Sequence, residues 1–138
     1  MHKSVQKLIQ IEKLVKSKNI DLKKITIIAI SKTFKLEKIL PLIDYGHLDY
    51  GENKVQEALD KWSDIKSKKP DIKLHLVGKL QSNKVKFAVK IFDFIHSVDT
   101  KKLAKKIADE ESKLKKKIKI FIQVNIGYED QKSGVNKE

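Results

Sequence analysis

Lys32 has a position in the sequence that could support chemistry, because it ends an apolar segment. Residues 25–32 read Ile-Thr-Ile-Ile-Ala-Ile-Ser-Lys, with no charge before the final lysine. A short uncharged run rich in β-branched residues predicts a strand, and its lack of alternation predicts that helices cover both of its faces, as in a parallel sheet. Such folds place ligands and chemistry at the carboxyl ends of their strands. A lysine that only marks where the strand reaches water is the simpler alternative.

Polar or glycine-containing segments also follow the other predicted strands. In a parallel barrel these segments converge with Lys32 on one face, and their glycines let backbone approach a ligand closely. They show neither a carboxylate pair in an acid/base arrangement nor a cluster at metal-ligand spacing. His75 and His96 are expected to be core or rim residues with local hydrogen bonds rather than ligands. The segments are Gly51-Glu52-Asn53, Gly78-Lys79, Ser97-Val98-Asp99 and Asn125-Ile126-Gly127.

The hydrophobic pattern alternates between helical and extended spacing along the whole chain. This alternation predicts an α/β fold with a parallel sheet made of right-handed βαβ units, without deciding between an open doubly wound sheet and a barrel. The missing Gly-x-Gly-x-x-Gly turn and phosphate loop after the first strand disfavour a nucleotide-binding sheet. Helices are predicted across residues 4–18, 36–43, 55–65, 85–92 and 103–114, and strands across residues 25–32, 48–51, 73–78, 94–97 and 118–126.

Several local features predict where the helices begin, bend and end. Pro41 removes a backbone donor and should kink or split the second helix, which Gly46 is expected to cap at its carboxyl end. Asn53, with Gln56 three residues later, has the spacing of a capping box. The later helix starts are assigned to Ser82 or Asn83 and to Asp99 or Thr100.

Composition places the chain among globular proteins and argues against two classes of partner. The 138 residues are 40% hydrophobic, enough for a single core, and include no cysteine. The net charge is +13, yet all 31 basic residues are lysine, and a dedicated nucleic-acid reader without arginine would be unusual. No apolar run approaches the roughly 20 residues that span a bilayer, and the amino terminus lacks a secretory signal core. We therefore expect a soluble cytoplasmic protein.

Five motifs together resemble a known family. The motifs are Ala29-Ile30-Ser31-Lys32-Thr33, Tyr50-Gly51-Glu52-Asn53-Lys54-Val55-Gln56-Glu57, His75-Leu76-Val77-Gly78-Lys79-Leu80-Gln81-Ser82-Asn83-Lys84, Ile95-His96-Ser97-Val98-Asp99 and Gln123-Val124-Asn125-Ile126-Gly127, and a Lys132-Ser133-Gly134 segment follows them. With these motifs the sequence closely resembles the pyridoxal phosphate homeostasis proteins, which are barrel proteins similar to the N-terminal domain of alanine racemase. The motifs occur in the family's order and spacing.

The resemblance implies that Lys32 forms an internal aldimine with pyridoxal 5′-phosphate (PLP). Such an amine must be deprotonated part of the time, and partial burial at a barrel mouth would lower its pKa from about 10.4. Asn53 is implied near the cofactor, with a role as a helix cap equally open. Ser97 and Asn125 are expected to line the same pocket. For residues 81–84 a role in a loop and cap is favoured over cofactor contact.

The resemblance implies that the protein carries or buffers the reactive PLP aldehyde and is not an enzyme. Its implied role is therefore PLP homeostasis without catalysis. A PLP-dependent racemase is the alternative from another class, and it requires a catalytic residue opposite the cofactor. A basic nucleic-acid-binding module is the least favoured possibility.

The length departs from the family pattern. Complete barrels usually need about 200 residues or more, so residues 1–138 are expected to form the N-terminal portion of one PLP-binding domain, a partial (β/α) TIM-type barrel of five strands. The family's phosphate cup comes from the last strands, so PLP should be held weakly. The first and fifth strands are expected to be unpaired edges, and residues 118–126 are expected to be an aggregation-prone apolar strand. A separate chain that supplies further strands and a non-functional gene remnant both stay open.

Overall fold

The computed structural model describes residues 1–127 and 134–136. Its helices and strands alternate as the sequence predicts, with two short 3₁₀ turns at Leu22–Lys24 and Ser82–Lys84. The helices are α1 (Lys3–Ser17), α2 (Leu36–Tyr45), α3 (Val55–Lys68), α4 (Val85–Ile91) and α5 (Lys101–Leu114). The strands are β1 (Ala29–Ile30), β2 (Asp49–Glu52), β3 (Lys73–Leu76), β4 (Phe94–Val98), β5 (Lys119–Ile122), β6 (Val124–Asn125) and β7 (Val135–Asn136).

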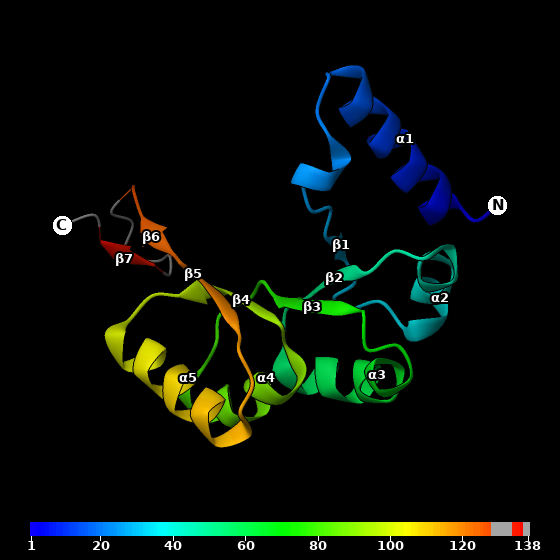
Figure 1. Cartoon of the computed structure of the whole chain (residues 1–138). Helices are drawn as coiled ribbons and strands as arrows, with labels where there is room; N and C mark the ends of the chain where they lie inside the picture. The colour runs from blue at the N-terminus through cyan, green and yellow to red at the C-terminus, as the bar shows by residue number, and fades with distance from the viewer. Residues whose placement is uncertain (128–133, 137–138) are drawn as a thin grey trace.

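The main sheet has five parallel strands in the order β1-β2-β3-β4-β5. Helices α3, α4 and α5 lie along one side of it, and α1 lies beyond the β1 end, beside α2 (Figure 1). β6 and β7 form a second, two-stranded parallel sheet. The five-stranded sheet with its helices confirms the predicted α/β fold and matches part of a TIM-type barrel. Within the described ranges, no helix is both long and apolar enough to cross a bilayer.

The core lies between the sheet and helices α2–α5. Side chains alternate between the two faces of a strand, and those that face the helices are buried while the opposite face is more open. A Cβ atom placed on Gly51 would point toward Ile28, Ile30 and Val77, so these side chains lie on the same, more open face of the sheet. Ile30 on that face is 48% exposed. Core residues with no exposed surface are Tyr50, Ala58, Trp62, Leu74, Leu76, Val85, Ala88, Val89, Phe92, Ile95 and Val98.

The first strand is shorter and more exposed than predicted. Only Ala29–Ile30 forms β1, whereas residues 25–32 were expected to be a strand covered on both faces. Within the described residues β1 pairs with β2 alone and lies at the edge of the sheet. Because the face that carries Ile30 is open, the isoleucine run is not enclosed, and Ile25 is also exposed.

The predicted fifth strand, residues 118–126, is also wrong in its extent. The chain forms β5 and then β6, which belong to different sheets. Between them, the Gln123 N–H donates to the Val98 carbonyl at 2.8 Å, which ties this junction to the end of β4. All four residues of β5 are exposed, and β5 is the other edge of the main sheet, as expected.

Helix α2 contains Pro41 and is continuous from Leu36 to Tyr45, so the predicted split does not occur. A proline at this position removes one backbone hydrogen bond, and the helix persists because Ile39 and Ile43 are buried in the core. Gly46 caps the helix as predicted, with φ +104° and its N–H bonded to the Ile43 carbonyl at 3.0 Å.

Two of the three other predicted helix starts are wrong. Lys54, not Asn53, is the N-cap of α3, and it makes no side-chain cap bond. Ser82 and Asn83 lie in the 3₁₀ turn that precedes α4, so neither caps that helix. Thr100 does cap α5, because its hydroxyl accepts from the Leu103 N–H at 3.1 Å.

We expect Ile122→Lys to reduce self-association, because Ile122 is exposed on the edge strand β5 and a lysine on an edge disfavours pairing with another chain. Concentration-dependent light scattering measures the effect. Leu114→Lys is the matched control, because Leu114 is exposed on helix α5 rather than on an edge. Equal scattering from the two variants would contradict the edge-pairing explanation.

Candidate functional site

Lys32 lies in the turn that follows β1, at the carboxyl end of the parallel strands. Its neighbour Ser31 is buried, whereas Lys32 is exposed. Within the described part of the chain, the Lys32 amine makes no hydrogen bond or ion pair. The partial burial expected for this side chain is therefore absent. Its amine is accessible and is not held by another described group.

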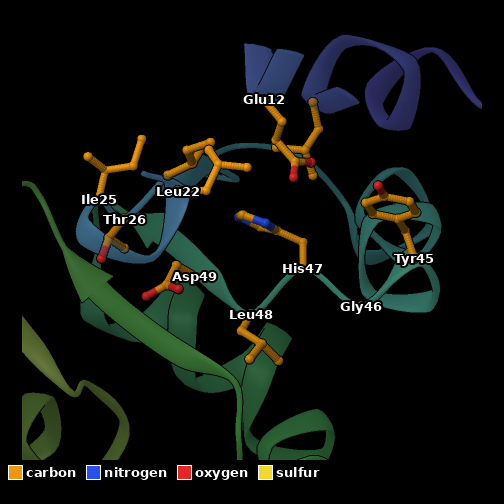
Figure 2. Close-up of a pocket in the computed structure, with 11 residues that line it drawn as sticks. Glu12, Leu22, Ile25, Thr26, Tyr45, Gly46, His47, Leu48 and Asp49 are labelled. Atoms are coloured by element: carbon orange, nitrogen blue, oxygen red, sulfur yellow. The ribbon is translucent and has the colours of Figure 1, made fainter. Parts of the chain in front are cut away.

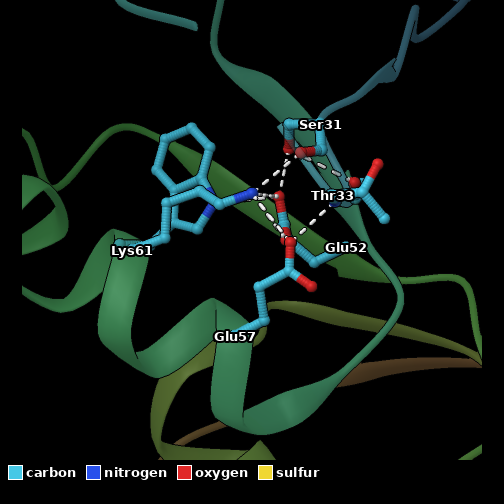
Figure 3. Close-up of polar contacts among 7 residues, drawn as sticks. Ser31, Thr33, Glu52, Glu57 and Lys61 are labelled. Atoms are coloured by element: carbon cyan, nitrogen blue, oxygen red, sulfur yellow. Dashed lines mark hydrogen bonds and ion pairs between the residues drawn. The ribbon is translucent and has the colours of Figure 1, made fainter. Parts of the chain in front are cut away.

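A fully buried carboxylate, Glu52 at the end of β2, anchors the residue before Lys32. The Glu52 carboxylate accepts hydrogen bonds from the Ser31 hydroxyl and, at 3.1 Å, from the Trp62 indole N–H. The Lys61 ammonium lies 3.2 and 3.1 Å from its two oxygens (Figure 3). Burying a charge is costly unless it is paired and hydrogen-bonded. These three donors are what makes the burial of Glu52 possible.

The same cluster holds the residue after Lys32. The Thr33 N–H donates to Glu57 Oε1 at 2.7 Å, and Lys61 lies 3.2 Å from that oxygen (Figure 3). Lys61 also donates to the Ser31 carbonyl at 2.8 Å. Burial opposes ionisation of Glu57, but the Thr33 N–H and the Lys61 ammonium outweigh it, so the pKa of Glu57 lies below its ordinary value.

Local sequence rules explain how these groups meet. Tyr50 and Glu52 are two residues apart on β2, so both point toward the helices. Glu57 and Lys61 are four residues apart on α3, so they share one face of that helix. Sequence reasoning missed Glu52, Glu57 and Lys61 as site residues. The signal available was an acidic residue at a core-facing strand position followed by an i,i+4 ion pair.

Asn53 and Ser97 come together around Gly78, at the neighbouring strand ends. A Cβ atom on Gly78 would lie 2.5 Å from the Asn53 carbonyl oxygen and would also collide with the Asn53 side chain, so only glycine fits there. Ser97 is buried, and its hydroxyl donates to the Gly78 carbonyl at 2.7 Å. A cavity of about 400 Å³ borders Asn53 together with three lysines, Lys54, Lys79 and Lys84.

Asn125 lies farther along, in the two-stranded sheet. It is half-buried in β6 and pairs with Asn136 of β7. The Gly134 N–H donates to the Asp99 carboxylate at 3.3 Å, which connects this small sheet to the loop after β4. Lys132 and Ser133, which belong to the motif quoted above, lie outside the described residues.

The two histidines of the sheet make local hydrogen bonds, as predicted. His75 Nε2 lies 2.8 Å from an Asp49 carboxylate oxygen, and His75 Nδ1 lies 2.9 Å from His96 Nε2. The His75 ring stacks on Phe94 with the ring centroids 4.2 Å apart, and the His96 ring stacks on Phe121 with the centroids 4.6 Å apart. Burial and repulsion from His75 lower the pKa of His96. Among the residues with described positions, no group of three or more side chains could hold a metal ion.

A separate cavity of about 520 Å³ lies at the opposite end of the strands (Figure 2). It is lined by residues that precede β1 and begin β2, including Ile25 and Asp49, and by Glu12 of α1. His47 points into it, and its Nε2 atom is buried without a partner within the described chain. This cavity is distant from the carboxyl ends of the strands and so does not belong to the Lys32 site.

Comparisons with known proteins match most of the chain. A family model described as the N-terminal domain of alanine racemase matches residues 15–138. A pyridoxal phosphate homeostasis protein from Pasteurella multocida is 36% identical over 111 residues, which are 80% of this chain and 48% of that protein.

Two solved structures of PipY from Synechococcus elongatus share the fold. The structure without PLP has a TM-score of 0.78 at 35% identity, and the match covers 91% of this chain and 58% of PipY. The structure with PLP bound has a TM-score of 0.74 at 34% identity, covering 91% and 57%. The chain thus spans about half the length of the relatives it matches.

We expect Lys61→Met to lower the free energy of unfolding by about 3 kcal/mol or more, because it leaves the buried Glu52 carboxylate without its cation. Urea unfolding measures the loss. Lys68→Met is the control, since Lys68 pairs with Asp64 in an exposed ion pair and should change stability by no more than about 0.5 kcal/mol. Losses of equal size would show that the Glu52 charge does not depend on Lys61.

We expect the free energy of unfolding to fall as the pH drops from about 8 to about 5.5. His96 has a lowered pKa in the folded chain, whereas in the unfolded chain it titrates near 6.5, so below that pH the unfolded state binds a proton that the folded state does not. Urea midpoints across this pH range measure the effect. His96→Gln should flatten the dependence, and an unchanged slope in that variant would contradict the assignment.

Proposed function

The chain belongs to the alanine racemase N-terminal domain family, and on this premise we propose that it binds PLP through the amine of Lys32 and serves PLP homeostasis. The observation that carries the proposal is the accessible, uncommitted Lys32 amine at the carboxyl end of β1. Ligands of parallel α/β folds bind at that end of the strands. The relative from Pasteurella multocida is named for PLP homeostasis, and PipY binds PLP in one of its structures.

The chemistry of the surrounding residues fits this cofactor. PLP supplies an aldehyde, which condenses with a primary amine and releases water, and a phosphate, which is anionic. Lys32 offers the amine without losing an existing contact. Lys54, Lys79 and Lys84 place positive charge around the cavity beside Asn53, which suits an anionic group.

Roles for the other candidate residues follow from where they lie. We assign Asn53 to direct contact with the cofactor, because it borders that cavity. Ser97 contributes through Gly78, whose carbonyl its hydroxyl bonds. Asn125 is assigned to the rim of the pocket on the β6 side. Because the relatives are about twice as long, binding by this chain alone should be weak.

A carrier fits the site better than an enzyme. A racemase needs an acid/base residue opposite the cofactor, and the carboxylates next to the Lys32 turn, Glu52 and Glu57, are engaged by backbone or by Lys61. We therefore propose a non-catalytic role in the cytoplasm, with a racemase-like enzyme as the second candidate. Racemisation of an amino acid by the PLP-loaded chain would favour the enzyme.

We expect Lys32→Ala to lose most of the label when the chain is incubated with PLP and reduced with borohydride, because no other amine in the described part of the chain lies in the turn after β1. Peptide mass spectrometry locates the label, and visible absorbance reports the bound cofactor before reduction. Lys23→Ala is the control, because Lys23 lies in the 3₁₀ turn that precedes β1 and not at the carboxyl ends of the strands. Equal labelling of all three chains would make Lys32 an ordinary surface amine.

A further inference from the structure

We propose that Glu52, Glu57 and Lys61 form a positioning clamp that fixes the backbone on both sides of Lys32 and so presents its amine to the cofactor. This inference rests on the proposed function. The clamp holds the residues immediately before and after Lys32, through Lys61 and Glu52 at Ser31 and through Glu57 at Thr33. None of the three is a PLP-contacting group in this proposal, since each acts on the turn.

The clamp fixes the turn without occupying the reactive group. Its contacts with residues 31–33 reach the Ser31 carbonyl, the Ser31 hydroxyl and the Thr33 N–H. The two carboxylates share the Lys61 ammonium, so their charge is directed at Lys61 rather than at Lys32. A turn held in this way leaves the Lys32 amine free to react while limiting the directions in which it can point.

Thr33 shows that the turn is held away from its relaxed conformation. Its φ is +67°, in the left-handed region that β-branched residues rarely adopt. Such a conformation persists only where surrounding contacts impose it, and it is concentrated at ligand clamps and active sites. The bond from the Thr33 N–H to Glu57 is the contact that holds it here, at 2.7 Å.

The burial of charge gives a second indication of positioning. Glu52 is fully buried and the Lys61 side chain is 8% exposed. Well-packed apolar residues would stabilise a fold at least as well as a buried ion pair, whereas charged and hydrogen-bonded groups fix geometry. The charges also sit against a strand end, where a precise backbone position matters for a ligand.

Glu57 allows the clamp to be tested without removing the buried pair, since its side chain is 30% exposed. We expect Glu57→Ala to lower the PLP label at Lys32 severalfold, as measured by borohydride reduction and peptide mass spectrometry. Glu57→Gln should restore labelling, because its amide oxygen can still accept from Thr33. Glu110→Ala, which breaks an ion pair on α5, is the matched control. Urea unfolding of each variant separates positioning from stability.

Labelling of Lys32 at the wild-type level in Glu57→Ala would overturn the clamp. A loss of label that is fully explained by a larger unfolded fraction of that variant would also overturn it. Amide hydrogen exchange tests the clamp without PLP. The Thr33 amide should exchange about tenfold faster in Glu57→Ala than in wild type, because its acceptor is gone. If wild type shows no preference for Lys32, the proposed function fails, while unchanged exchange at Thr33 shows that the clamp itself fails.

Discussion

The need to pair one buried carboxylate governs the arrangement of this end of the molecule. Glu52 has no exposed surface, so its charge must be met by donors inside the protein. Those donors come from two other elements, the Ser31 hydroxyl after β1 and the Lys61 and Trp62 side chains of α3. A single carboxylate thus joins the end of the first strand, the end of the second strand and the helix behind them. The position of the Lys32 turn is a consequence of that junction.

The two faces of the sheet differ, and this difference determines where the candidate site lies. One face is packed against α3–α5, and the other carries Gly51, His75, His96 and Phe121. Side chains that point to the packed face provide the anchoring contacts, as Glu52 and Ser97 do. At the carboxyl ends of the strands, backbone held by these contacts lies next to the more open face of the sheet. Rigid support on one side and access on the other are what the proposed PLP site requires.

Sequence reasoning identified what depends on local pattern. The order of helices and strands, the caps at Gly46 and Thr100, and the local bonding of His75 follow from spacing and residue type. The extent of β1 did not, because enclosure of residues 25–32 depends on neighbours on both sides of an edge strand, and a β-branched run does not reveal whether they exist. The cap at Asn53 was wrong because the chain turns one residue later, at Lys54. The Glu52 cluster joins residues up to 31 positions apart in the sequence, from Ser31 to Trp62, so no local window contains it.

The hydrogen bonds of Asp49, His75 and His96 form a row in which each group constrains the next. A carboxylate oxygen of Asp49 can only accept, so His75 Nε2 is the donor of that hydrogen bond. In the second bond, His75 Nδ1 and His96 Nε2 share one proton, so one of these two nitrogens donates and the other accepts. Neither imidazole can change the role of its nitrogen in that bond unless the other ring changes its role as well, which couples the two rings across β3 and β4.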